Sequence, residues 1–173
     1  LMAAVAKMRT YLVTPELIQR GMGEMQRMML ASGVTTVSDM GTGIFASFDM
    51  EAGLIKAAFE RNSNPSRVML MPIASQIATD TNLDRWFAGI QTKWSSPHIR
   101  VDRRIKMLAD GAFFAQNMMM NPPGYTDGHQ GKWITEPEVV MAQFRRFWDA
   151  GFSLHVHVNG DMGLDVVLDG LAA

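Results

Sequence analysis

The chain has 173 residues, of which 47% are hydrophobic and 19% charged, and its formal net charge is -1 at pH 7. This composition predicts a globular domain that is long enough to bury one core, and the near-neutral charge excludes a basic nucleic-acid-binding surface. No apolar run approaches the ~18 residues of a membrane span. The lack of cysteine excludes disulfides, thiolate metal sites and a cysteine nucleophile, and it fits a reducing, cytoplasmic location.

The apolar spacing predicts one helix in front of four strand–helix units. The first helix begins at Thr14 with Pro15 in its first turn, and it ends at Gly33. Short apolar or β-branched runs predict four strands, at 34–39, 68–73, 105–109 and 154–158. A helix is predicted after each strand: 48–61, 80–94, one that opens with a capping box at Thr135 and closes at Gly151, and one that carries Leu164 to Leu171.

Strict alternation of strands and helices predicts parallel strands joined by right-handed crossovers, in sequential order. Two architectures satisfy this pattern, a flavodoxin-like sheet and part of a (β/α)8 barrel. No glycine-rich phosphate loop follows any predicted strand, which argues against a nucleotide-binding fold. We expect a single domain over residues 1–173 with a loop insertion at 112–134, which is either a cover for substrate or a surface loop.

Two histidines alternate along the last predicted strand. His155 and His157 share one face of that strand, because side chains repeat at every second residue, and Asn159-Gly160-Asp161 follows at once. In a (β/α)8 barrel this strand-to-helix junction is where catalytic and metal-binding side chains lie. The alternative interpretation is that neighbouring groups satisfy both histidines in an ordinary strand.

The strand at 105–109 contains a lysine and ends in Asp-Gly. Lys106 is unusual there, because lysine is rarely buried unless it is paired. An edge strand whose ammonium group reaches water is the alternative explanation.

Four segments taken in order resemble the amidohydrolase superfamily, specifically its family-3 metal-dependent hydrolases. Residues 30–39 resemble the second strand of that family, 105–111 the fourth, 131–138 the return into the next helix, and 157–161 the fifth strand. The family's His-x-His pair on the first strand, its sixth-strand histidine and its eighth-strand aspartate have no counterpart. The chain is therefore expected to be a partial TIM (β/α)8 barrel of about four consecutive β/α units, either a truncated product or a fragment of a longer enzyme.

The resemblance implies a divalent metal, normally zinc, that hydrolyses an amide-type carbon–nitrogen bond of a small molecule with metal-activated water. His157 would be a metal ligand and Lys106 the lysine whose carbamate bridges two metals. His155 would orient a ligand or hydrogen-bond in the core. Asp110 and Asp161 are candidate catalytic carboxylates, although Asp161 is equally suited to cap the last helix.

Several expected metal ligands are missing, so we expect this polypeptide to be inactive alone and to bind metal weakly. Open barrel edges would favour self-association. We expect no nucleic-acid or membrane partner. The alternative function is a non-catalytic α/β binding or interaction domain, in which Lys106 and the histidines are structural.

Overall fold

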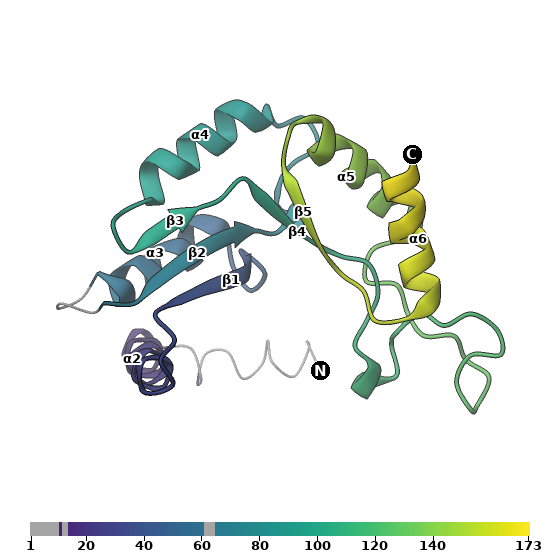
Figure 1. Ribbon diagram of the computed structural model, residues 1–173, viewed down its shortest axis with the longest axis horizontal. Coiled ribbons are helices and arrows are strands. Elements are labelled where there is room, and N and C mark those ends of the chain that lie inside the picture. The colour runs from purple at the N-terminus through teal and green to yellow at the C-terminus, as the bar shows by residue number, and fades with distance from the viewer. Residues whose placement is uncertain (1–10, 12–13, 61–64) are drawn as a thin grey trace. The chain divides into compact units, whose positions relative to one another are not determined.

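The computed structural model describes residues 11, 14–60 and 65–173 (Figure 1). They form two compact units. The first contains the described residues up to Leu70 together with Gly89–Asp102, and the second contains Met71–Ala88 and Arg103–Ala173. No helix in these described ranges is both long enough and apolar enough to cross a bilayer. The expectation of a single domain stays a prediction.

The first unit opens with helix α2 (Pro15–Ala31), whose ends are those predicted. The Thr14 hydroxyl accepts a hydrogen bond from the Leu17 N–H at 3.3 Å, and Pro15 occupies the first helical position. After the helix, Gly33 adopts a φ of 76°, and the Val34 N–H donates to the Met29 carbonyl at 2.8 Å. Glycine suits this site because the left-handed conformation is strained for other residues.

Three strands form the sheet of the first unit, in the order β1 (Thr36–Thr42), β2 (Arg67–Pro72) and β3 (Ile99–Val101). Strands β2 and β3 are parallel, with Val68 opposite Ile99. Helix α3 (Phe48–Phe59) begins at Ser47, whose hydroxyl accepts from the Met50 N–H. It ends two residues before the predicted Arg61, which lies outside the described residues.

Helix α4 (Leu83–Trp94) follows the short 3-10 turn η1 (Ala74–Gln76). It starts three residues later than the predicted Asp80, because the side chain of Asn82 accepts from the Arg85 N–H and so caps the first turn. At the C-terminal end of α4, the Lys93 ammonium and the Trp94 indole both donate to the Asp49 carboxylate of α3.

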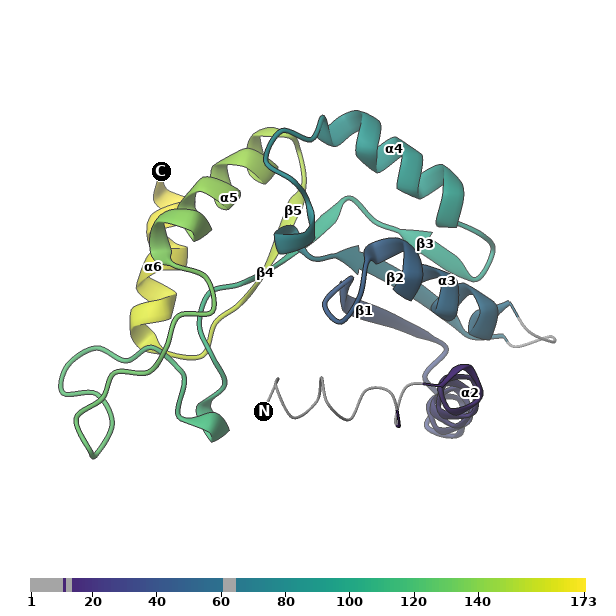
Figure 2. The ribbon, with the colours of Figure 1, turned by 180° about the vertical axis from the view of Figure 1, so that it is seen from behind.

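The second unit contains the parallel pair β4 (Arg104–Leu108) and β5 (Ser153–His157), and helices α5 (Pro137–Asp149) and α6 (Asp161–Ala172). Helix α5 packs on this strand pair and on α6 (Figure 2). The core of this unit is formed by apolar side chains with at most 4% exposure, among them Ile105, Met107, Val140, Phe144, Phe147 and Phe152. Helix α5 begins at Pro137 with no side-chain cap, so the capping box predicted at Thr135 is not formed.

The third predicted strand is present as β4, one residue earlier than predicted, but an additional strand, β3, precedes it and lies in the other sheet. The chain leaves the extended conformation at Asp102–Arg103. The Arg103 guanidinium donates to the Ala150 carbonyl at 2.6 Å and lies over the Phe152 ring at 4.6 Å from its centroid. This side chain therefore turns toward the helical layer at the point where β4 begins.

The predicted loop at 112–134 is a folded element with internal hydrogen bonds. It contains the 3-10 turn η2 (Phe113–Ala115). Two backbone contacts close it internally: the Met120 N–H donates to the Gln130 carbonyl at 2.8 Å, and the Lys132 N–H donates to the Asn117 carbonyl at 3.1 Å. Such contacts hold the long loop in one conformation, and its role as a cover for substrate stays a prediction.

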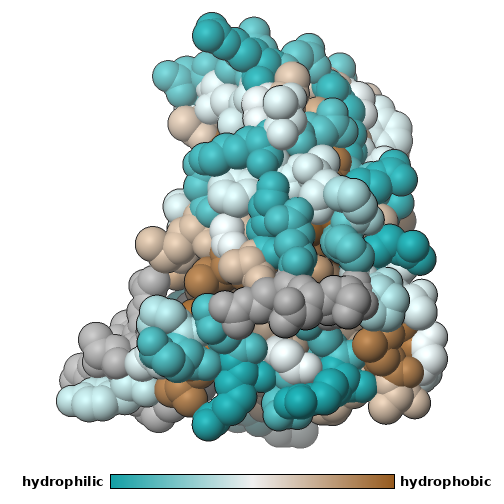
Figure 3. Space-filling view, turned by 90° about the vertical axis from the view of Figure 1, so that its left-hand side faces the viewer, coloured by the Kyte–Doolittle hydropathy of each residue, from teal (hydrophilic) through white to brown (hydrophobic). Residues whose placement is uncertain are grey.

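One face of the molecule is drawn in Figure 3. Hydrophilic side chains predominate on it and hydrophobic ones are scattered among them. Isolated apolar side chains of this kind are normal for a protein surface and do not mark a binding site.

Candidate functional site

The candidate site lies on strands β4 and β5 of the second unit, where the parallel register sets which side chains are neighbours. Lys106 pairs with His155, and Leu108 pairs with His157. Ile73, just after β2, forms a parallel bridge with Lys106 from the other side. Side chains that are paired in this way share one face of a sheet. Lys106, His155 and His157 therefore lie on one face, as the alternation in the sequence predicts.

The opposite face of the pair belongs to the core. Ile105 is fully buried and Met107 is 1% exposed, and helix α5 packs on the strands that carry them. Because neighbours along a strand alternate, Lys106 faces away from α5. Its side chain is nevertheless mostly covered, with 8% of the residue exposed. Lys106, for which an edge strand was the alternative explanation, is thus paired with His155 on one side and bridged to Ile73 on the other.

The surroundings of this face disfavour the positively charged forms of Lys106 and His155. Burial lowers the pKa of the Lys106 ammonium below its ordinary value. Burial also lowers the pKa of His155, and the positive charges of Lys106 and Arg104 lower it further. Both shifts favour the neutral form of each group more than full exposure to water would.

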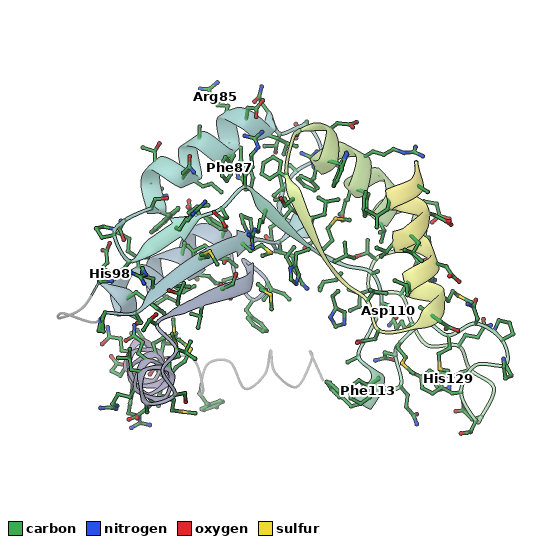
Figure 4. All side chains as sticks on the ribbon, in the orientation of Figure 1. Arg85, Phe87, His98, Asp110, Phe113 and His129 are labelled. Carbon is green, nitrogen blue, oxygen red and sulfur yellow. The ribbon has the colours of Figure 1, made fainter. Side chains whose placement is uncertain are left out.

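Asp110 follows β4 and is fully buried. Its carboxylate accepts three backbone hydrogen bonds, from the N–H groups of Met119 at 2.9 Å, Asn159 at 2.8 Å and Gly160 at 2.7 Å. It lies beside the start of α6 and joins this turn to the long loop (Figure 4). These contacts give the Asp110 carboxylate a structural role, and its predicted catalytic role stays a prediction.

The last strand ends in a turn that contacts the site histidine. Nδ2 of Asn159 lies 3.0 Å from Nε2 of His157 and 3.0 Å from the Gly111 carbonyl oxygen. The sequence includes Asn159 in the motif after the histidines, but residue patterns assigned it no role. The sequence feature that could have indicated a role is an asparagine two residues after the histidine that ends the strand, and asparagine at such a position is also typical of an ordinary turn.

Asp161 is the first residue of α6, whose N-cap is Gly160, so the prediction that Asp161 caps this helix is wrong. Its Oδ1 accepts from the Asn121 N–H of the loop at 2.9 Å and from the Met162 N–H at 2.9 Å. These backbone donors, Asn121 first, lower the pKa of Asp161. The carboxylate therefore anchors the loop to the helix, and its predicted catalytic role is not tested by these contacts.

The two remaining histidines have other partners. His98 of the first unit lies with Nδ1 3.1 Å from the Ser66 carbonyl oxygen. His129, in the long loop, contacts Asp127 through Nδ1 and the Gln116 carbonyl through Nε2, and it stacks on Tyr125 at 4.3 Å between ring centroids. Figure 4 shows His129 in the loop. Both imidazoles therefore have hydrogen-bonding partners within the protein.

A metal requires more donors than this face supplies. Within the described ranges, no group of three or more histidine, cysteine, aspartate or glutamate side chains is arranged to hold a metal ion. Catalytic zinc sites ordinarily use three protein ligands. Lys106 and His157 would contribute two at most, so the described residues do not fit a complete metal site by themselves.

No protein-family profile matches the chain, and no curated protein matches it. Two solved structures share its fold, both of uncharacterized metal-dependent hydrolases. The protein from Pyrococcus horikoshii OT3 is 17% identical with a TM-score of 0.66, over 95% of this chain and 32% of that one. The protein from Pyrococcus furiosus is 19% identical with a TM-score of 0.67, over 96% of this chain and 34% of that one. The chain thus spans about a third of the length of the structures it matches.

Proposed function

We propose that this chain forms consecutive β/α units of a TIM (β/α)8 barrel, and that the complete protein is a metal-dependent hydrolase of the amidohydrolase type. The observation that carries the proposal is the row of Lys106, His155 and His157 on one face of two parallel strands. His157 is the last residue of β5, and barrel enzymes place their chemistry at the C-terminal ends of strands. The fold shared with one third of two metal-dependent hydrolases supports it.

In this proposal His157 and Lys106 are metal ligands, His155 orients the site, and the remaining ligands come from other segments of the complete protein. A bound divalent cation, zinc in our proposal, would supply a hydroxide from water and polarise the bond to be hydrolysed. We propose an amide-type carbon–nitrogen bond as the substrate. Lys106 contributes a desolvated amine, which is the form that reacts with carbon dioxide to give a carbamate.

Metal titration tests this proposal. Calorimetry with Zn²⁺ and Co²⁺ should show weak binding that is lost in His157→Ala and kept in His98→Ala, since His98 belongs to the first unit. If both variants bind like the unchanged chain, the metal-site proposal is wrong.

Lysine carboxylation has a test of its own. Carbon-13 NMR with labelled bicarbonate should show a carbamate signal that Lys106→Arg removes and Lys93→Arg preserves. A signal unaffected by Lys106→Arg would assign the carbamate elsewhere.

Activity measurements complete the test. We expect no hydrolysis of amides or esters by this chain alone with added zinc, because its ligand set is incomplete. Hydrolysis abolished by His157→Ala would contradict the expected inactivity while supporting a hydrolase. Absence of both metal binding and hydrolysis in the complete protein would favour a non-catalytic binding domain instead.

A further inference from the structure

One atom of Asn159 makes two contacts that together determine how its amide is oriented. Nδ2 lies 3.0 Å from the Gly111 carbonyl oxygen and 3.0 Å from Nε2 of His157. A carbonyl oxygen only accepts hydrogen bonds, so the atom that faces it must be a donor. The amide nitrogen therefore faces Gly111, and the reversed orientation, with the amide oxygen there, would place two acceptors against each other.

The same nitrogen then determines the protonation of the imidazole. An amide NH2 group donates two hydrogen bonds and accepts none, so one N–H donates to the Gly111 carbonyl and the other to His157. Nε2 of His157 must act as the acceptor. A neutral imidazole has one donor and one acceptor nitrogen, so its proton lies on Nδ1. We infer that Asn159 is a positioning residue that sets His157 in the Nδ1–H tautomer.

The turn that carries Asn159 is held independently of this side chain. The Asn159 N–H donates to Oδ1 of Asp110 at 2.8 Å, and the Gly160 N–H donates to Oδ2 at 2.7 Å. A methyl group on Gly160 would lie 1.8 Å from the Met119 carbonyl oxygen, so no other side chain fits there. The buried Asp110 carboxylate thus holds the backbone, and the backbone holds the amide toward the ring.

The tautomer decides which ring nitrogen carries the lone pair. With the proton on Nδ1, the lone pair lies on Nε2, at the tip of the ring, where it accepts the hydrogen bond from Asn159. A proton or cation that binds Nε2 would have to replace the Asn159 amide as the partner of that lone pair. That His157 uses Nε2 in a hydrolase site rests on the function proposed above, whereas the tautomer itself does not.

Nitrogen-15 NMR of histidine-labelled protein tests the inference at a pH where His157 is neutral. We expect the His157 proton on Nδ1. Asn159→Asp keeps the size of the side chain but offers His157 only acceptor oxygens, so the proton should move to Nε2. Asn159→Leu removes the donor, and the Nδ1–H form should lose its predominance. Asn121→Leu is the matched control, because that amide contacts Asp165, and it should leave His157 unchanged.

Unchanged signals from His129 and His98 would show that each variant is folded. A wild-type proton on Nε2, or an Nδ1–H form that persists in a folded Asn159→Leu protein, would overturn the inference. If a variant fails to fold, the tautomer seen in the wild-type spectrum tests the inference by itself. An Nδ1–H tautomer in a protein that neither binds metal nor hydrolyses substrate would reject the proposed function and keep this inference. Metal binding through His157 with the other tautomer would reject only the inference.

Discussion

At the scale of residues, one buried carboxylate connects three segments that are distant in the sequence. Asp110 accepts backbone hydrogen bonds from the loop at Met119 and from the turn at Asn159 and Gly160. A buried charge is tolerated only when such donors compensate its loss of water. Asp110, which the sequence suggested as a catalytic carboxylate, therefore has a structural role in holding these segments together.

Asp110→Ala should destabilise the second unit by about 3 kcal/mol, because it leaves buried N–H groups without their charged acceptor. Chemical denaturation followed by tryptophan fluorescence measures the change, with Asp169→Ala at an exposed position of α6 as the control. Equal effects of the two substitutions would contradict the structural role of Asp110.

Two histidines of the second unit should titrate on opposite sides of the ordinary histidine pKa of 6.5. The carbonyl of Gln116 and the carboxylate of Asp127 raise the pKa of His129. Burial, Lys106 and Arg104 lower the pKa of His155. Proton NMR of the ring signals against pH measures both, and Lys106→Met should raise the pKa of His155 while leaving that of His129 unchanged.

The signs of these shifts give opposite effects on stability. His129 is protonated more readily in the folded chain, so its contribution is complete below pH 6.5 and disappears as the pH rises through its raised pKa. His155 resists protonation in the folded chain, so its contribution is complete above pH 6.5 and is lost as the pH falls through its lowered pKa. Histidines that titrate together would contradict both assignments.

At the scale of elements, the junction between β5 and α6 depends on glycine for space rather than for backbone freedom. Gly160 has an ordinary φ of -85°, but a methyl group there would lie 1.8 Å from the Met119 carbonyl oxygen. Backbone is the obstacle, so the loop itself would have to move. The close packing of this junction is what brings Asn159 to His157.

Gly160→Ala should therefore destabilise the second unit by about 3 kcal/mol, within the range measured for overpacked interiors. Gly23→Ala in helix α2 is the matched change, since nothing lies within 4 Å of its added methyl group. It should stabilise that helix by about 0.5–1 kcal/mol. Thermal unfolding measures both, and a neutral Gly160→Ala would contradict the described packing.

At the scale of the whole molecule, β1 is one outer strand of the three-stranded sheet and β5 is one outer strand of the pair, and outer strands offer unpaired backbone groups to other chains. Helix α6 also exposes Leu164, Leu168 and Leu171, each by at least 45%. We propose that the chain associates with itself through such surfaces.

Sedimentation at increasing concentration should give an average mass above that of the monomer. A variant with Leu164, Leu168 and Leu171 changed to glutamate would identify α6 as the interface if it restores the monomer. A wild-type chain that stays monomeric at high concentration would reject self-association.

The local signals in the sequence determined most of the elements. Thr14, Pro15 and Gly33 bound α2 as predicted, because caps and left-handed turns depend on a few neighbouring residues. The alternation of His155 and His157 predicted their common face for the same reason. Local patterns also placed Lys106 within a strand, although its burial between Ile73 and His155 depends on pairing across the sheet.

Only the tertiary structure decided what depends on contacts between distant segments. It added strand β3 ahead of the predicted third strand, packed Arg103 on Phe152 between the two, and paired Lys106 with His155. It also gave Asp110 three backbone donors and Asn159 its contact with His157. Register, burial and hydrogen-bond partners arise from pairs of residues far apart in the chain, and a single sequence records each residue but not its partner.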